Sequence, residues 1–192
     1  MRRLWAAGVG LVVAAAGVMS GAGPAGSAPH RAPVAAAGCS TVWGSGAKSA
    51  ESAEDAVGKS LKNIRTSRER CYDRMVFEVG GAAPRLGYRV GYVDAFRRDG
   101  SGDAMRVAGG AILQIFVSAP SCDPNTLRQT YAGRAGKPLP GVDVTGYKTF
   151  RDARFGSSFE GQTQVGLGVR ARLPFRVTQS RGKLIVDVAH TW

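Results

Sequence analysis

The chain has 192 residues, which leaves room for an export leader and one domain with its own hydrophobic core. Lysine and arginine number 26 against 14 aspartate and glutamate residues, so the formal charge is +12 at pH 7. An excess of one sign favours an anionic partner such as a wall polymer or a lipid headgroup. Because no recognition-helix, zinc-finger or RNP-like aromatic pattern accompanies the charge, we do not expect a nucleic acid partner.

The N-terminus has the layout of a secretory signal peptide. Arg2 and Arg3 precede an apolar run from Leu4 to Met19, and small residues follow through Ala28. The run is shorter than the roughly 20 residues that a membrane-spanning helix needs, and glycines interrupt it. We therefore predict a signal peptide at residues 1–28 and a secreted or cell-wall-associated protein.

Residues 29–42 are rich in alanine and proline and lack periodicity, which predicts a flexible tether before a domain at 43–192. Trp43 follows in a glycine- and serine-containing loop, and we interpret it as a plug on the surface of the domain. The stretch from Lys48 to Val57 is expected to form one or two helical turns that end at Gly58.

Three cysteines in an exported chain indicate one disulfide and one unpaired thiol. We favour a Cys39–Cys71 bond, although Cys122 is an equally available partner for Cys71. A loop of about thirty residues closed in this way would stabilise the fold by about 3–4 kcal/mol. Small residues before Cys39 also suit a lipoprotein cysteine, but they stand about twenty residues beyond the apolar run. Membrane anchoring is therefore expected only if Cys39 is lipidated.

From Ser60 onward the hydrophobic residues recur with a period of two. Between Cys71 and Val79, the apolar Met75 and Phe77 face away from Arg74, as in a half-buried strand. The preceding run from Ser60 to Thr66 completes a predicted hairpin. Further strands are expected at Tyr88–Phe96, Ala111–Val117, Val144–Phe155 and Gly161–Arg172, with a last hairpin over Phe175–Ala189.

The connections complete the predicted architecture. Residues 99–103 form a glycine-rich hairpin loop that returns through Met105 and Val107, and a long loop spans Ser118–Gly141 with a short helical turn at Asn125–Tyr131. Gly166 and Gly168 share one face of their strand, which predicts a bulge or the close approach of another group. We expect an all-β fold: a β-sandwich or a small, partly open barrel of short antiparallel strands, with a minor helical turn.

Several motifs, taken in order, resemble the AMIN-like domain of exported actinobacterial proteins. The first half is carried by Arg65-Thr66 and by Cys71-Tyr72-Asp73-Arg74-Met75-Val76-Phe77-Glu78-Val79, with Trp43-Gly44-Ser45 before them. The second half is carried by Phe159-Glu160-Gly161, Val165-Gly166-Leu167-Gly168-Val169, Pro174-Phe175-Arg176-Val177 and Leu184-Ile185-Val186-Asp187-Val188-Ala189-His190. The resemblance spans Trp43 to His190.

This resemblance implies a β-sandwich related to the AMIN domains that accompany cell-wall amidases and pilus secretins. Those domains bind peptidoglycan or localise envelope machinery, so the expected function is an exported, non-catalytic cell-envelope module that binds peptidoglycan or another anionic wall polymer. The pattern departs from the family in two respects: the domain stands without an amidase part, and the loop around Cys122 has no counterpart in the motifs.

Catalytic constellations are poorly supported. The two histidines, His30 and His190, are too few for a zinc amidase, and no metal or other cofactor is expected. A Ser-His-Asp site would have to use His190 beside Asp187, yet no serine stands on a nucleophile elbow. Nothing in the spacing of the remaining acidic candidates selects a glycosidase pair; these candidates are Asp73, Asp94 and Glu160. We predict that the protein is not an enzyme.

Binding is expected to use aromatic rings, which stack on sugars, and arginines, which pair with carboxylates. The predicted binding residues are Tyr88, Arg89, Tyr92, Arg154, Arg170 and Arg172. Two alternatives remain: a small-molecule or lipid-binding envelope protein with an apolar pocket under the loop Ser118–Gly141, and a module that binds another protein of an envelope complex.

Overall fold

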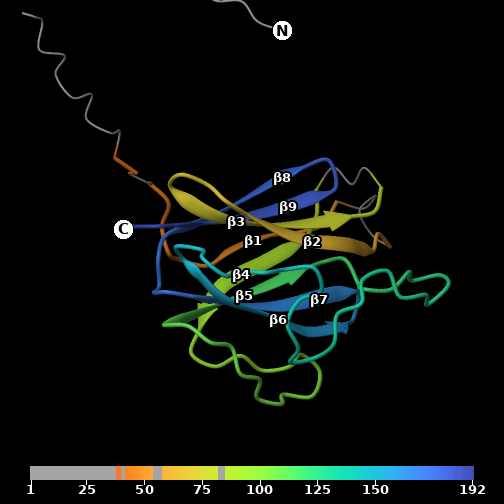
Figure 1. The fold of residues 1–192 in the computed structure, drawn as a ribbon. Coiled ribbons are helices and arrows are strands. Elements are labelled where there is room, and N and C mark those ends of the chain that lie inside the picture. Colours follow the sequence, from red (N-terminus) through yellow and green to blue (C-terminus); the bar gives the residue numbers. More distant parts are fainter. Residues whose placement is uncertain (1–37, 40–41, 54–57, 82–84) are drawn as a thin grey trace, which may run out of the picture. The chain divides into compact units, whose positions relative to one another are not determined.

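The period-two segments pair into two antiparallel β-sheets that pack face to face (Figure 1). The computed structural model describes residues 38–39, 42–53, 58–81 and 85–192. The predicted signal peptide and most of the predicted tether lie outside the described residues. Two separate sheets make the fold a β-sandwich and not a closed barrel, and the described residues contain no helix.

The larger sheet, sheet A, has five strands and the smaller, sheet B, has four. Sheet A runs in the order β1 (Lys48–Ala50), β4 (Tyr88–Val93), β5 (Ala111–Val117), β7 (Gln162–Val169) and β6 (Phe150–Phe159). Sheet B runs in the order β2 (Leu61–Arg68), β3 (Tyr72–Val79), β9 (Lys183–Ala189) and β8 (Phe175–Ser180).

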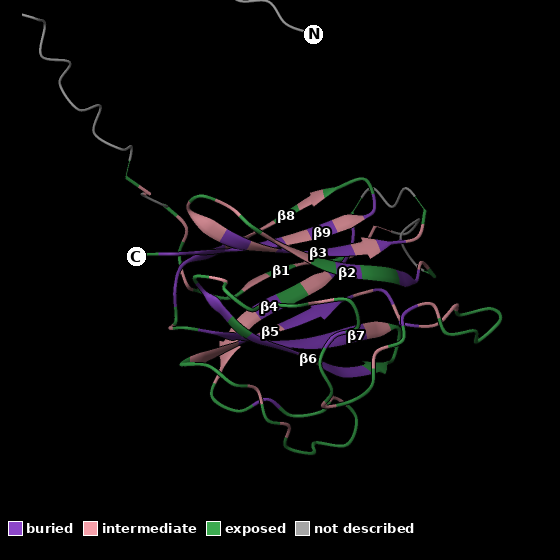
Figure 2. Ribbon diagram, in the orientation of Figure 1, coloured by how far each residue is buried: buried purple, intermediate pink, exposed green. Residues whose placement is uncertain are grey.

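The core lies between the two sheets and is filled by alternate residues of their inner faces. Phe77 of β3 and Phe175 of β8 are fully buried on sheet B, and Leu113 of β5 and Leu167 of β7 are fully buried on sheet A. Figure 2 shows that buried residues concentrate in the central strands and exposed ones in the loops. Because one face of each strand is committed to the core, the register decides which side chains point outward.

The predicted strands are confirmed in type and order, and the helical predictions are wrong. Residues 48–50 of the predicted helical segment form β1, an edge strand paired with β4, and residues 54–57 lie outside the described residues. The predicted helical turn at Asn125–Tyr131 is a tight turn instead. The Asp123 carboxylate accepts hydrogen bonds from the two backbone N–H groups that follow Pro124, and Leu127 takes a φ of 56°.

Strand β6 begins later than the sequence pattern suggested, at Phe150 instead of Val144. Asp143 Oδ1 accepts the Thr145 N–H at 2.8 Å, and the Tyr147 N–H donates to the Val144 carbonyl, so this stretch is a pair of turns. The apolar Val144 packs against the core from a turn, which explains why its sequence pattern looked like a strand.

The connection between β4 and β5 covers the glycine face of β7, so of the two predicted outcomes, a bulge or the close approach of another group, the structure shows the second. Residues 94–110 leave sheet A, form a turn closed by the Arg97–Ala104 bridge, and return across the outer face of the sheet (Figure 1). A Cβ atom on Gly166 would lie 2.9 Å from the Phe96 ring, and one on Gly168 would collide with the Ala108 carbonyl oxygen. Glycine is therefore required where this connection crosses β7. The predicted return strand through Met105 and Val107 does not form.

Two strand edges are covered by neighbouring segments. At β8, the Gln179 side-chain amide accepts the Leu86 N–H at 2.6 Å and donates to the Leu86 carbonyl at 3.0 Å. At β6, Leu139 N–H donates to the Ala153 carbonyl and Phe155 N–H donates to the Lys137 carbonyl. Backbone groups that an edge strand would expose are thus paired within the domain.

Candidate binding surface on sheet B

A row of three charged side chains crosses the outer face of sheet B. Arg74 of β3 and Arg176 of β8 both stand opposite Asp187 of β9 in the strand register. Their parity places them on the face away from the core, since Met75 and Val186 point inward. The sheet therefore brings two arginines to one carboxylate.

The Asp187 carboxylate is completely buried beneath the two guanidinium groups. Arg74 donates from Nε to Oδ1 at 2.7 Å and from Nη2 to Oδ2 at 3.0 Å, and Arg176 donates from Nε to Oδ2 at 2.8 Å. The side chain of Asp187 is 0% exposed, whereas those of Arg74 and Arg176 are 27% and 37% exposed. The group carries a net positive charge, and its charged outer surface is formed by arginine.

Two aromatic rings interleave with these arginines. The Arg176 guanidinium lies 4.3 Å from the Trp43 ring centroid and 5.2 Å from that of Tyr72, and Arg74 lies 5.2 Å from the Tyr72 ring. The Tyr72 hydroxyl accepts a hydrogen bond from Arg74 Nη2 at 3.2 Å. We call Trp43, Tyr72, Arg74, Arg176 and Asp187 the aromatic–arginine cluster. Planar rings and guanidinium groups held in this way are pre-organised to contact a flat or anionic ligand.

The donors of this cluster are only partly used. The hydrogen bond with Asp187 raises the pKa of Arg74 above its ordinary value, so the guanidinium is charged at every physiological pH. Among the described residues, Arg176 donates only from Nε, to Asp187, and its two terminal nitrogens have no protein acceptor. These N–H groups form a fork of the kind that binds a carboxylate or a phosphate oxygen pair.

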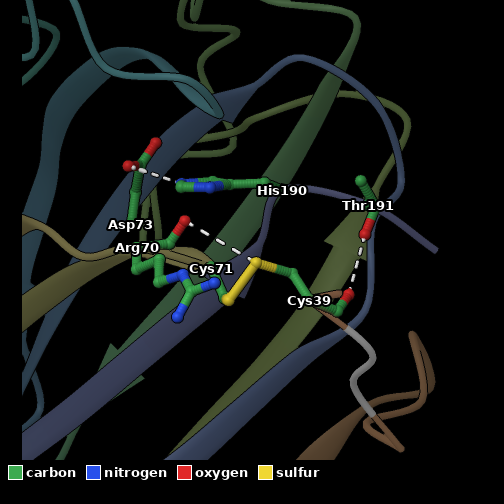
Figure 3. The surroundings of a disulfide bond; sticks show 6 residues. All are labelled: Cys39, Arg70, Cys71, Asp73, His190 and Thr191. Atoms are coloured by element: carbon green, nitrogen blue, oxygen red, sulfur yellow. Dashed lines mark hydrogen bonds and ion pairs between the residues drawn. A yellow bond between two sulfur atoms is a disulfide. The ribbon is translucent and has the colours of Figure 1, made fainter. Parts of the chain in front are cut away.

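The chain segment that carries Trp43 is fixed to the sheet by a disulfide. Cys39 and Cys71 are bonded, with a Cα–Cα distance of 5.2 Å, which confirms the favoured pairing and leaves Cys122 unpaired. Figure 3 shows Thr191 Oγ1 donating to the Cys39 carbonyl at 3.2 Å beside this bond. A disulfide-bonded Cys39 has no thiol to acylate, so lipidation and this bond exclude each other. The Gly44 carbonyl also accepts the Phe175 N–H at 3.2 Å, next to Trp43.

A second buried carboxylate lies on the inner face of the same sheet. Asp73, 0% exposed, accepts the N–H groups of Thr149 and Phe150 on Oδ2, at 2.5 and 3.1 Å. Its Oδ1 lies 3.0 Å from His190 Nε2 (Figure 3). His190 therefore pairs with Asp73 and not with Asp187, which corrects the hypothetical Ser-His-Asp arrangement. Because all three partners of Asp73 are internal, this group holds the fold together.

The other two carboxylates considered for glycosidase chemistry, Asp94 and Glu160, lie in different exposed segments of the chain. Asp94 is exposed and forms an ion pair with Arg172 at 2.5 Å. Glu160 is exposed in the turn between β6 and β7, with a φ of 46°. Within the described residues, no group of three or more His, Cys, Asp or Glu side chains is arranged to hold a metal ion.

The six binding residues expected from sequence are spread over the molecule. The Tyr88 and Tyr92 rings pack against the core; the Tyr92 hydroxyl donates to the Leu173 carbonyl at 2.7 Å, and burial raises its pKa to about 12. The structure brings Tyr92 within 5.8 Å of Arg172, and Arg89 borders the same cavity as Tyr92 while lying over the Phe116 ring. The other two arginines lie apart from these: Arg154 pairs with Asp152, and Arg170 donates to the His190 carbonyl. A binding role for these six stays a prediction.

The aromatic–arginine cluster was missed from sequence, although part of its signal was present. Tyr72 and Arg74 alternate with inward residues on one strand, so a shared outer face was readable. The tight turn after Ser180 also sets Arg176 opposite Asp187. The pairing of β3 with β9 joins residues more than a hundred positions apart, and no local pattern encodes it.

The loop expected to cover an apolar pocket instead borders a polar cavity. That cavity, of about 320 Å³, is lined by Lys62, Asp123, Thr126, Arg128, Gln129 and Thr130. The lining of this cavity is polar and charged, which does not suit an acyl chain. The described part of the chain also contains no helix with the length and hydropathy needed to cross a bilayer.

The fold and this surface define a small antiparallel β-sandwich module with a cationic, aromatic outer face. The chain belongs to the AMIN-like domain family, whose model matches residues 59–190. AMIN-like domains are non-catalytic binding modules, so membership indicates a cell-envelope module, and the disulfide is compatible with an extracytoplasmic location. Comparison with curated proteins and with solved structures gives no match.

Proposed function

We propose that this domain is an exported, non-catalytic module that binds peptidoglycan or another anionic wall polymer through the aromatic–arginine cluster. Family membership supports a role in the envelope, and the formal charge of +12 supports an anionic partner. The contacts of the buried Asp73–His190 pair are internal, which supports a binding role over catalysis at this pair.

The observation that carries this proposal is the state of Arg176. Its Nε is fixed by a fully buried carboxylate and its Cζ atom lies 4.3 Å from the Trp43 ring centroid, while its terminal nitrogens have no acceptor among the described residues. A guanidinium that is already oriented loses little conformational entropy when it binds a carboxylate of a wall peptide. The half-buried Trp43 and Tyr72 beside it supply apolar area for a sugar ring.

The test is co-sedimentation of the mature protein with purified peptidoglycan at low and high ionic strength. We expect salt-sensitive binding that weakens about tenfold in Arg176→Gln, since an oriented charge-assisted hydrogen-bond pair is lost. Arg128→Gln removes the same charge from an exposed loop residue outside the cluster and serves as the matched control. A second variant, Trp43→Ala, should weaken binding while leaving the charge unchanged.

Two results would contradict the proposal. One is the absence of binding by the unmodified protein at low ionic strength. The other is an equal loss in Arg176→Gln and Arg128→Gln, which would show that net charge alone attracts the polymer. Thermal unfolding of each variant must accompany the assay, so that a loss of fold is not scored as a loss of binding.

A further inference from the structure

A separate cavity lies on the outer face of sheet A, away from the core. It has a volume of about 580 Å³ and is lined by Arg106, Val107, Ala108, Gly136, Asp152 and Arg154. Its walls come from three segments: the connection 94–110, the turn around Gly136, and strand β6. The volume falls within the range of about 300–1,000 Å³ typical of small-molecule sites.

The cavity is lined by a buried carboxylate, that of Asp152, whose oxygens already accept hydrogen bonds from the protein. Asp152 Oδ2 accepts the Ala108 N–H at 2.9 Å, and Oδ1 accepts the Ala153 N–H at 2.9 Å. Both oxygens also accept from Arg154 Nε, at 2.8 and 2.9 Å. Asp152 therefore orients Arg154, as Asp187 orients Arg176. Its carboxylate oxygens already accept hydrogen bonds from protein donors, so they offer no free acceptor site to a cation.

The remaining charge around the cavity is positive. Arg154 donates to described residues only through Nε, and its side chain is 30% exposed. Arg106 is exposed, and its guanidinium has no recorded partner in the described part of the chain. Arg134 and Lys137 flank Gly136 in the sequence and are also exposed. The lining therefore contains two guanidinium groups and one carboxylate, and that carboxylate is already hydrogen-bonded.

The walls are held by hydrogen bonds that do not involve the open donors. Gly136 N–H donates to the Phe155 carbonyl at 2.8 Å, and Phe155 N–H donates to the Lys137 carbonyl at 3.0 Å. On the opposite wall, Ala108 is fixed by Asp152 and lies closely against Gly168. The two arginines thus project from segments whose backbones are already positioned, which lowers the entropic cost of binding.

We propose that this cavity binds a phosphate ester. Two guanidinium groups from different segments suit a tetrahedral group with several acceptor oxygens, whereas a planar carboxylate is satisfied by one fork. The lining contains no aromatic ring, which disfavours stacking of an unmodified sugar. The volume exceeds that of a bare anion and leaves room for the alcohol part of the ester. This inference does not depend on the ligand of the aromatic–arginine cluster.

The experiment is NMR titration of the ¹⁵N-labelled mature protein with glycerol 3-phosphate, and in parallel with acetate and glycerol. We expect saturable shifts of the amides at 106–110, 136 and 152–154 with the phosphate ester and none with glycerol. Arg106→Gln should weaken this binding at least about tenfold, because an exposed charge-assisted donor is lost without disturbing a recorded contact. Lys148→Gln is the control and should bind unchanged, because Lys148 is exposed and its side chain makes no hydrogen bond or ion pair with the described residues.

The same titration distinguishes a small phosphorylated ligand from a phosphodiester polymer, and it also gives the results that would contradict the proposal. Saturation by glycerol 3-phosphate alone supports a small phosphorylated ligand, while a large further gain with poly(glycerol phosphate) supports a phosphodiester polymer. Absence of shifts at the cavity, equal binding of acetate, or full affinity in Arg106→Gln would overturn the proposal. Arg154→Gln is a second variant, and its amide spectrum reports whether Asp152 and the surrounding fold persist. Arg176→Gln should leave this binding intact, so the two sites fail independently.

Discussion

Sheet B carries two completely buried carboxylates, Asp73 on its inner face and Asp187 on its outer face. Asp73 accepts hydrogen bonds from two backbone N–H groups and contacts the His190 ring, all inside the domain. Asp187 is covered by two arginines whose far sides meet solvent. Two equally buried carboxylates thus have different roles: the inner one joins distant segments of the chain, and the outer one orients a charged surface.

Removing the inner carboxylate should have the largest effect. Asp73→Ala leaves the Thr149 N–H, the Phe150 N–H and the His190 ring without their acceptor. Each buried unsatisfied group costs about 1–3 kcal/mol, so we expect the free energy of unfolding to fall by about 3–5 kcal/mol. Urea denaturation measures it, with Asp143→Ala in an exposed turn as the control. A loss below about 1 kcal/mol would refute the structural role of Asp73.

The disulfide should have the next largest effect, because it fixes the N-terminal segment to the start of β3, just before Tyr72 and Asp73. The double variant Cys39→Ala with Cys71→Ala opens a loop whose ends are 32 residues apart. We expect a loss of about 3–4 kcal/mol of unfolding free energy from the chain-entropy estimate. Cys122→Ala, which removes the unpaired thiol, is the control in the same denaturation experiment. Equal stability of the double variant and the control would mean that the bond does not constrain the domain.

The outer carboxylate should give the smallest loss of stability and a distinct loss of binding. Asp187→Asn keeps the shape of the side chain but releases Arg74 and Arg176 from an ion pair that is partly solvent-screened, so we expect about 1–2 kcal/mol. Retention on peptidoglycan at moderate salt should fall, because the arginines lose their fixed orientation. If Asp187→Asn destabilised the protein as much as Asp73→Ala while binding persisted, the cluster would be structural, and Asp187 and Asp73 would have the same role.

Local alternation predicted most of the strands, because each strand buries one face. It also predicted that something approaches Gly166 and Gly168, which the Phe96 and Ala108 contacts confirm. It failed at Lys48–Ala50, the start of the segment Lys48–Val57 for which helical turns were expected, because pairing with β4 imposes a strand there. Tertiary contacts decide the structure of so short a segment.

The candidate sites were less accessible to sequence reasoning than the fold. Arg154 was among the binding residues expected from sequence and lines the cavity of the phosphate-ester proposal, whereas Arg106 of the same cavity lies in a connection without periodicity. The Asp73–His190 contact spans 117 residues, and a contact of that separation leaves no trace in local spacing. Sequence therefore predicted which face a side chain occupies far better than which side chain it meets.

The two hydrogen bonds between the Gln179 side chain and the Leu86 backbone have a consequence for how copies of this domain behave when they are close together. An unpaired strand margin is a template on which a second polypeptide can add its own strand. Here a side-chain amide fills that position at one margin and the Lys137–Leu139 backbone fills it at another. Many copies gathered on one polymer should therefore remain distinct folded particles at these margins, without growing into continuous intermolecular sheets.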